Sequence, residues 1–327
     1  MRRIRTGILG ISTETAQHLA SLLESHSFIN VTDIADTAEY EGKRLKDLDI
    51  WKISDRIPPY IRSIPLAGTS PNLQCDLVFS CIGNSRNEAE NRFADHNYPV
   101  ITYSNNSSLD KYLPLIIPEV NENHVKLIKI QKKEKFRKRG FIASITNSLV
   151  FNIAIAAKPF IDRYSLKKIC IGFEESSNKK EASETGLSGL SDTLRQVFGE
   201  FKISEIVPSD IDIELGNIPE HINDPVRLIL DMELNRPVEE LDSKKLFNLF
   251  RSISLKSNKY SVPENIINYP ENGIKEYLTR DNYFTLRDFR QADDYNFQLR
   301  LEYSNSLSKI AGRMIILAEF LKNEGSL

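Results

Sequence analysis

The sequence predicts an α/β protein in two parts: a parallel α/β domain over residues 1–147 and an α+β domain with a mostly antiparallel sheet over residues 148–304. In the first part, short apolar runs alternate with segments of helical spacing, which is typical of a parallel sheet covered by helices on both faces. In the second part, several segments alternate apolar and polar residues, as in an antiparallel sheet with one covered face. At 327 residues the chain is also too long for one ordinary core.

Buried strands are predicted in the first part wherever a short apolar run ends at a turn. They lie at residues 3–11, 28–36, 75–83, 98–104 and 140–144. Helices are predicted over 13–25, with Thr13 as the N-cap, and over 87–96. A ligand of such a sheet is expected across the carboxyl ends of its strands.

The second part shows strand patterns that alternate or nearly alternate. They lie at residues 163–175, 225–234, 283–290 and 295–303. Helices predicted over 190–201 and 237–253 are expected to cover this sheet, and a last helix is predicted over 304–322.

The composition is that of a soluble globular protein, with 40% hydrophobic and 27% charged residues. A formal net charge of -2 gives no overall field to attract nucleic acid or an acidic membrane. The sequence also lacks the run of about 18 uncharged apolar residues that a membrane helix needs, and it lacks a signal-peptide pattern. We therefore expect a cytoplasmic protein that binds neither nucleic acid nor membrane.

Three cysteines, Cys75, Cys81 and Cys170, are too few and too widely spaced for a disulfide framework. No histidine lies at metal-ligand spacing from them, so no metal site is expected. The basic run at 132–140 is interpreted as a solvated connector before a strand.

A polar turn, Thr146-Asn147-Ser148, separates the strand at 140–144 from a long apolar run that ends at Lys158-Pro159. Many enzymes use a strand, a short polar turn and a buried helix to present a nucleophile or to bind a phosphate. Ser148 is therefore the first candidate for chemistry in this chain.

Several stretches together resemble the archaeal and fungal type of aspartate-β-semialdehyde dehydrogenase, among them "IIPEVN", "GFIASITNSLVF" and "NSLSKIAGRMIILAE". The similarity covers most of the chain and is strongest between residues 75 and 165. Members of that family reduce aspartyl-β-phosphate with NADPH through a cysteine thioester. The resemblance implies a Rossmann-type domain, a catalytic and dimerisation domain, and a C-terminal helix, here residues 305–323, that packs back on the first domain.

At the nucleophile motif the resemblance implies a change of chemistry. The family reads Asn-Pro-Asn-Cys where this chain reads Ile145-Thr146-Asn147-Ser148, so Asn147 remains as a substrate-binding residue and Ser148 replaces the cysteine. A cysteine thiol, with a pKa of about 8.5, is partly ionised at neutral pH, whereas a serine hydroxyl needs a strong adjacent base. An oxoester also accepts hydride less readily than a thioester, because resonance stabilises its carbonyl group more.

The dinucleotide-binding turn implied by the resemblance has lost glycines. Gly7 and Gly10 remain and Ser12 follows them, but Thr13 and Ala16 stand where the family has glycines. Those glycines let the backbone approach a pyrophosphate and let the helix pack on the strand.

Acidic residues lie around the same turn. Glu14, at the N-terminus of the predicted helix, is expected to repel a phosphate. Glu39 stands where the family usually has an arginine for the 2′-phosphate of NADP, and both Asp36 and Glu39 can accept a ribose hydroxyl, which favours NAD over NADP. With Gly312 in the last helix, these residues complete the expected cofactor site, and we expect weak NAD(P) binding or none.

In the substrate site implied by the resemblance, acidic residues stand at two positions where the family has arginines. Asp110, in a loop that also contains Asn105, stands for a phosphate-binding arginine, and Glu214 stands for the arginine that holds the substrate carboxylate. His221 falls at the general-base position, although a histidine in a polar loop is otherwise an ordinary surface residue. Gly186 belongs to the matching substrate loop. Without both arginines, a doubly anionic substrate loses its bidentate hydrogen bonds.

Three functions remain open on these residues. The first is a non-reducing descendant of the family, either a pseudoenzyme or a structural or regulatory partner of another protein. The second is a repurposed enzyme that uses Ser148, with His221 as base, for acyl or phosphoryl chemistry. The third is a working NAD(P)-dependent dehydrogenase with relocated residues. In each case we expect a homodimer or homo-oligomer, with the sheet of the second domain supporting the dimer, and a separate protein partner stays open.

Overall fold

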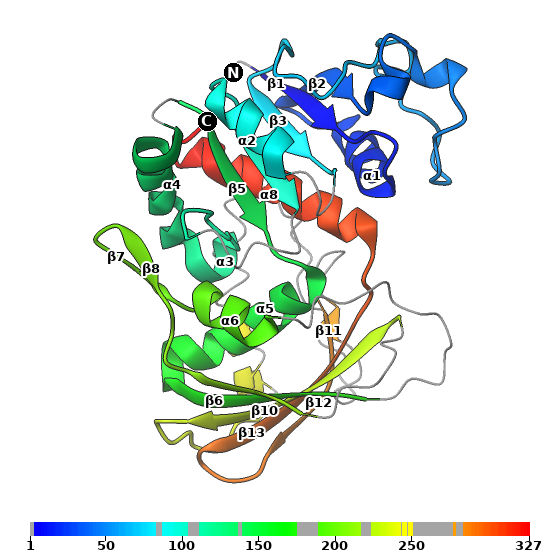
Figure 1. The fold of residues 1–327 in the computed structure, drawn as a ribbon. Coiled ribbons are helices and arrows are strands. Elements are labelled where there is room, and N and C mark those ends of the chain that lie inside the picture. The colour runs from blue at the N-terminus through cyan, green and yellow to red at the C-terminus, as the bar shows by residue number, and fades with distance from the viewer. Residues whose placement is uncertain are drawn as a thin grey trace.

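Two sheets organise the chain, one in each half (Figure 1). The computed structural model describes residues 3–82, 87–103, 111–136, 139–174, 189–216, 224–242, 244–246, 248–250, 277–278 and 284–327. In Figure 1 the five-stranded sheet lies in the upper half and the six-stranded sheet at the bottom, with α5 and α6 between them.

The first sheet is parallel throughout, with the strand order β2-β1-β3-β4-β5. Its strands are β1 (Ile4–Leu9), β2 (Ile29–Ala35), β3 (Leu77–Ser80), β4 (Pro99–Tyr103) and β5 (Phe141–Ile145). All five strands predicted from apolar runs are therefore confirmed. The order reverses at β1, so the carboxyl ends of β1 and β3 flank the crevice where α/β proteins bind ligands.

Helices cover both faces of this sheet, as its strand–helix alternation predicts. On one face, α1 (Glu14–Leu23) and α8 (Leu307–Asn323) share a core with strand residues such as Ile8. On the other face, α2 (Asn87–Asp95) packs Phe93 against strand residues such as Val78. The last helix of the chain thus packs on the first sheet, some two hundred residues away in sequence.

The second sheet is mixed, with the strand order β11-β12-β13-β10-β6-β9. Its strands are β6 (Leu166–Phe173), β9 (Asp212–Leu215), β10 (Val226–Leu234), β11 (Tyr277–Leu278), β12 (Thr285–Gln291) and β13 (Asn296–Tyr303). Every pair is antiparallel except β6 with β9, so the predicted mostly antiparallel sheet is confirmed. Alternate residues are buried against α5 (Ser148–Tyr164) and α6 (Leu190–Val197), and the residues between them, half-buried or exposed, form what we call the open face, on which no other described element packs.

The helix predicted over 190–201 is too long. It ends at Val197, and a two-stranded hairpin of β7 (Glu200–Lys202) and β8 (Glu205–Val207) follows. Gly199 lies between them, and a Cβ there would come within 2.5 Å of the Val207 carbonyl oxygen. The absence of a side chain at Gly199 therefore lets the hairpin pack closely, a contact that the helical spacing of this segment does not predict.

Shorter helices lie between strands of the first sheet. They are α3 (Pro118–Asn121), α4 (Leu127–Gln131), and single turns at Ala38–Tyr40, Leu45–Asp47, Glu122–Lys126 and Lys132–Phe136. Part of the basic run predicted as a solvated connector is thus helical, and Phe136 is buried. The predicted helix over 237–253 is helical at 244–246 and 248–250.

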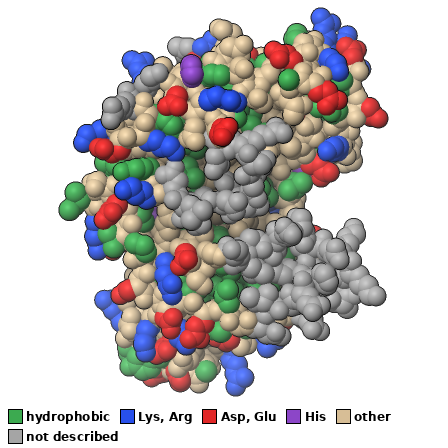
Figure 2. Space-filling model, viewed as in Figure 1, with side chains coloured by type: hydrophobic (Ala, Val, Ile, Leu, Met, Phe, Trp, Pro, Cys, Tyr) green, Lys and Arg blue, Asp and Glu red, His purple; other side chains and the backbone are tan. Residues whose placement is uncertain are grey.

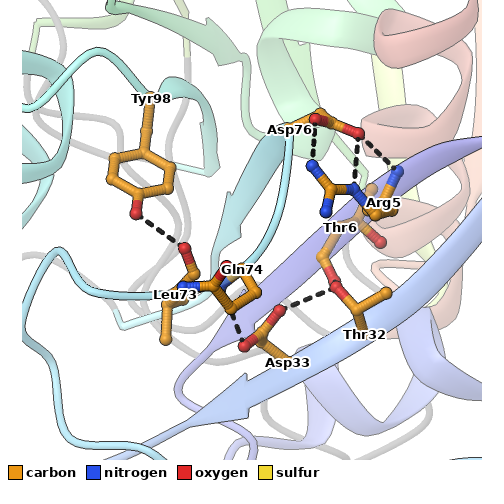
Figure 3. Close-up of polar contacts among 8 residues, drawn as sticks. All are labelled: Arg5, Thr6, Thr32, Asp33, Leu73, Gln74, Asp76 and Tyr98. Carbon is orange, nitrogen blue, oxygen red and sulfur yellow. Dashed lines mark hydrogen bonds and ion pairs between the residues drawn. The ribbon is translucent and has the colours of Figure 1, made fainter.

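Gly7 lies inside β1, three residues before the turn that follows the strand. A Cβ at Gly7 would lie 2.9 Å from Leu73 Cδ1 and 3.1 Å from Cys75 Sγ. The segment that carries these residues is tied down by polar contacts (Figure 3): the Gln74 N–H donates to Asp33 and the Tyr98 hydroxyl to the Leu73 carbonyl. This glycine makes room for a packed segment within the strand.

The surface carries both charges. On the face shown in Figure 2, Lys and Arg side chains are interspersed with Asp and Glu over both halves of the molecule. Among the described residues, no helix is both long and apolar enough to span a membrane. Within the same residues, no group of His, Cys, Asp and Glu side chains has the arrangement of a metal site.

Candidate functional site

The strand, turn and helix around Ser148 form as the sequence predicts. Asn147 caps α5, because its side-chain oxygen accepts a hydrogen bond of 2.8 Å from the Val150 N–H. Ser148 is the first residue of the helix and is only 2% exposed. The Asn152 amide donates to the Ser148 carbonyl at 2.7 Å, which fixes the backbone of this first turn. Ser148 therefore lies at the positive end of a long buried helix.

The residue in contact with the Ser148 hydroxyl is Arg313, which the sequence analysis missed. Arg313 comes from α8, is 3% exposed, and donates from Nη1 to Ser148 Oγ at 3.3 Å. Its guanidinium lies 3.8 Å from the centre of the Phe151 ring. A single arginine inside the apolar run "IAGRMIILA" was the available signal.

A buried tyrosine lies near this arginine, at the junction of β13 and α8. Burial raises the pKa of the Tyr303 phenol, the Asp224 carboxylate raises it further, and the positive charge of Arg313 opposes them. Asp224 accepts hydrogen bonds from the Ser304 hydroxyl at 3.1 Å and from the Asn305 N–H at 2.9 Å. These contacts anchor the start of α8, which carries Arg313.

In the turn between β1 and α1, two backbone N–H groups already donate hydrogen bonds within the protein. The Ser12 N–H donates to Asp36 Oδ2 at 2.7 Å, and the Thr13 N–H donates to the Gly10 carbonyl at 2.9 Å. The Thr13 hydroxyl caps α1 by accepting from the Ala16 N–H at 3.3 Å, as predicted. Gly10 has a φ of +82°, a conformation that favours glycine.

Asp36 closes this turn from the end of β2. It is 3% exposed, and its second carboxylate oxygen accepts from the Thr37 N–H at 2.8 Å. Glu39 is exposed in the turn Ala38–Tyr40, and Glu14 is exposed in the first turn of α1. Two exposed carboxylates and one buried carboxylate therefore surround the expected phosphate-binding turn.

Glu214, predicted to stand for a carboxylate-binding arginine, lies on the second sheet. It lies in β9, where its neighbour Ile213 packs in the core with α5. Because side chains alternate along a strand, Glu214 points to the open face, where it pairs with Lys168 at 2.7 Å. The sheet thus separates Glu214 from the helix that begins at Ser148.

The other predicted site residues divide into two groups. Asn105, Asp110, Gly186 and His221 lie outside the described residues. Gly312 lies in α8 directly before Arg313, and Met314, directly after it, lies with its sulfur 4.0 Å from Cys81 Sγ. This part of α8 therefore reaches both the end of β3 and the turn at Ser148.

Cysteine chemistry is unfavourable at the three native thiols. Burial raises the pKa of Cys75 and of Cys81 to about 12, and burial also raises the pKa of Cys170. The three thiols thus remain protonated at neutral pH.

Glu90, buried on α2, accepts a hydrogen bond from Thr102 at 2.5 Å, and desolvation raises the pKa of this carboxyl group.

A cavity of about 510 Å³ lies elsewhere, between α3, α5 and the β7–β8 hairpin, and Ser148 does not line it. His124, on its wall, is 1% exposed, with Nδ1 3.0 Å from the Asn121 amide and Nε2 3.0 Å from the Gly199 carbonyl. Burial lowers the pKa of His124, which keeps the ring neutral. Since both ring nitrogens are already hydrogen-bonded, this histidine is a structural residue.

Comparisons with known proteins show what this chain is similar to. Residues 5–128 match the family model of the semialdehyde dehydrogenase NAD-binding domain. The fold is similar to that of aspartate semialdehyde dehydrogenase from Candida albicans solved with NADP, with a TM-score of 0.76 and 19% identity over 99% of this chain and 100% of that chain. Similarity also extends to aspartate semialdehyde dehydrogenase II of Vibrio cholerae complexed with ASA, with a TM-score of 0.69 and 11% identity over 99% of both chains. The chain thus has an α/β fold with a Rossmann-type NAD-binding domain and a second domain with a mixed sheet, as in these structures.

The curated relatives that this chain resembles are aspartate-semialdehyde dehydrogenases. The protein of that name from Methanothermobacter thermautotrophicus is 22% identical over 97% of this chain and 99% of its own length. The one from Archaeoglobus fulgidus is 28% identical over 49% of this chain and 47% of its own length, so that match spans about half of each protein.

Proposed function

We propose that this chain is an aspartate-semialdehyde-dehydrogenase-like protein that does not carry out NADPH-dependent reduction of aspartyl phosphate. In this reading it is a pseudoenzyme, or a structural or regulatory partner, that keeps the fold and a ligand-binding site. The observation that carries the proposal is the side chain at position 148: a serine stands where the family resemblance places the cysteine, and its oxygen accepts a hydrogen bond from Arg313 at 3.3 Å.

The contact with Arg313 lowers the value of Ser148 as a nucleophile. A guanidinium has only donors and keeps its protons, so it cannot act as the base that a serine nucleophile requires. It also occupies a lone pair of the hydroxyl oxygen, the atom that would attack. Ser148 is therefore suited to hydrogen bonding rather than to forming an acyl intermediate.

The dinucleotide turn supports the same proposal. Residues 5–128 match an NAD-binding domain, yet the Ser12 N–H that would face a pyrophosphate is already bonded to Asp36. Glu14 and Glu39 add negative charge near the positions of the phosphates. These residues fit NADP poorly, so we propose weak NAD(P) binding and derive no catalytic step through it.

The direct test is phosphate-dependent oxidation of aspartate semialdehyde, followed by the absorbance of the reduced nicotinamide. We expect no turnover by the wild type, and none by Ser148→Cys alone, because the cofactor turn remains closed by Asp36. Ser148→Ala serves as the baseline. Robust turnover by the wild type would refute the proposal, and activity only in Ser148→Cys would show that the rest of the site is still competent.

The active-dehydrogenase alternative is favoured by the match to an NAD-binding domain and by the NADP-bound Candida structure. The repurposed-enzyme alternative needs a base for Ser148. That base would be His221, and hydrolysis of model acyl esters that is lost in both Ser148→Ala and His221→Ala would support it.

We further propose that the protein is a cytoplasmic homodimer formed through the open face of the second sheet. This face carries ion pairs such as Lys168–Glu214 and Arg300–Glu174, together with the half-buried Ile229. A further protein partner is compatible with this arrangement.

A further inference from the structure

Positive charge is concentrated in one short segment of this chain. Residues 126–139 contain eight lysines and arginines and one glutamate, although the whole chain has a formal net charge of -2. The helical turn Glu122–Lys126, α4 and the turn Lys132–Phe136 follow one another directly in this region. The remainder of the chain is therefore acidic, and its basic segment begins on one helical stretch.

Three lysines of this stretch lie on the same side of it. Lys126, Lys129 and Lys133 are exposed and are three and four residues apart, a spacing that brings helical side chains together. Among the described carboxylates, Glu134 alone forms an ion pair with them, at 3.1 Å from the 80% exposed Lys133. Neighbouring like charges repel one another on a helix surface. We call these three lysines the basic strip.

The β7–β8 hairpin is held beside the basic strip. His124, two residues before Lys126, has its Nε2 atom 3.0 Å from the carbonyl oxygen of Gly199, directly before β7. Lys126 and Phe201, which belongs to β7, line the same cavity. Figure 1 shows α4 and the hairpin on the same side of the molecule. The strip and the hairpin thus form one continuous surface.

The tip of this hairpin exposes an isoleucine in an unfavourable conformation. Ile203 is 97% exposed and has a φ of +58°, which β-branched residues rarely adopt. Its side chain gains almost no burial within the chain to offset this strain. Val207, at the end of β8, is also exposed. The hairpin therefore carries apolar side chains that the fold of the chain itself does not use.

The composition of this surface favours a protein over the other acidic partners. Single-stranded nucleic acids stack their bases on aromatic rings, whereas Phe136 is buried and Phe201 lines the cavity. An acidic membrane would repel Glu200 and Glu205, which are exposed on the two strands of the hairpin. A second copy related by a two-fold axis would place one basic strip against the other.

We propose that the basic strip and the tip of the β7–β8 hairpin form a docking surface for a partner protein. The partner presents a segment rich in Asp and Glu to the strip and apolar side chains to Ile203. Such a surface attracts its partner over a distance and binds it more weakly as salt is added. The inference gives a chemistry to the protein partner that the proposed function leaves open, and rests on that part of it.

The first test measures the basic strip with a fluorescein-labelled peptide of about twelve glutamates, by fluorescence anisotropy at low salt. The wild type should bind the peptide, and Lys129→Glu with Lys133→Glu should weaken binding at least about tenfold, because two attractions become repulsions. Lys46→Glu with Lys52→Glu is the matched control, since both lysines are exposed between β2 and β3 and the net charge changes equally. No binding by the wild type, or an equal loss in both double variants, would overturn the strip.

The second test measures the hairpin tip with a peptide of the same glutamates that ends in two leucines. The wild type should bind this peptide at least about threefold more tightly than the all-glutamate peptide, because the leucines cover Ile203. Ile203→Ser should remove this gain and leave binding of the all-glutamate peptide unchanged. A gain that persists in Ile203→Ser would remove the hairpin from the docking surface.

Other partners are distinguished with the same variants. Oligothymidine of matched length and vesicles that contain phosphatidylserine should both bind more weakly than the leucine-ended peptide. Tighter binding of either, lost in Lys129→Glu with Lys133→Glu, would reassign the surface to nucleic acid or membrane. A change of mass in that variant by light scattering would reassign it to a second copy. Dehydrogenase turnover by the wild type would refute the loss of reduction in the proposed function and leave these binding results unchanged.

Discussion

Gly140, directly before β5, shows how little room single positions leave at the edge of the first sheet. A Cβ at this position would collide with the carbonyl oxygen of Ala94, near the end of α2. A backbone carbonyl cannot turn aside as a flexible side chain can, so either α2 or β5 would have to move.

We expect Gly140→Ala to lower the free energy of unfolding by about 3 kcal/mol, the upper range for overpacking a core. Urea denaturation followed by circular dichroism measures this value. Gly172→Ala is a matched control, because its Cβ would meet Ile229 Cβ at an ordinary 3.8 Å. A loss below about 1 kcal/mol for Gly140→Ala would contradict the expected collision.

Single residues were predictable where their role depends on sequence neighbours. The N-cap role of Thr13 was confirmed, because capping residues are recognised by their distance from the helix they begin. The pairing of Glu214 with Lys168 was not predictable, because an alignment by sequence does not fix the face of a strand to which a side chain points. Arg313 was missed, because its contact with Ser148 spans 165 positions along the chain.

At the scale of elements, the turn between β1 and α1 lies where a dinucleotide-binding turn is expected, but one of its backbone N–H groups is already bonded to a side chain of the protein itself. The Asp36 carboxylate takes the Ser12 N–H, the type of donor that binds phosphate or ribose oxygens in such turns. A nucleotide must therefore displace a buried carboxylate and also tolerate the charge of Glu14 and Glu39.

Removing that carboxylate should open the turn. We expect Asp36→Ser to raise the affinity for NADPH at least about tenfold, since one like charge near a phosphate is removed and one N–H is freed. NADH should gain less, because the variant also loses an acceptor for its ribose hydroxyl. Isothermal calorimetry measures both, Asp55→Ser on the surface controls for net charge, and an unchanged NADPH affinity would show that Asp36 does not close the turn.

Helices and strands with a clear pattern of apolar residues were predictable from the sequence. Elements whose bounds depend on close tertiary packing were not. The parallel strands and α1 follow apolar runs and helical spacing that need no tertiary information. The β7–β8 hairpin interrupts a helical pattern because Gly199 lets Val207 approach the backbone. The continuation of α5 past Pro159 to Tyr164 was likewise not apparent, since proline usually ends a helical pattern.

At the scale of the whole molecule, the open face of the second sheet is a surface on which no other described element packs. Its charges are paired along the face, for example Arg227 with Glu302 at 2.8 Å and Arg300 with Glu174 at 3.0 Å. Exposed pairs of this kind contribute little to the stability of a single chain. A face that carries both signs can instead complement a second copy of itself across a two-fold axis.

Arg300, on the central strand β13, is the residue on which this dimer can be tested. We expect the wild type to have twice the mass of one chain by light scattering, and Arg300→Glu to shift it to the monomer, because the new carboxylate would face Glu174 and acidic groups of the second copy. Lys129→Glu, an equal charge reversal on α4, should leave the mass unchanged. Raising the salt concentration should weaken the wild-type dimer, since its polar contacts are screened. A monomeric wild type, or an Arg300→Glu variant that keeps the mass of a dimer, would assign dimer formation to another surface or exclude it.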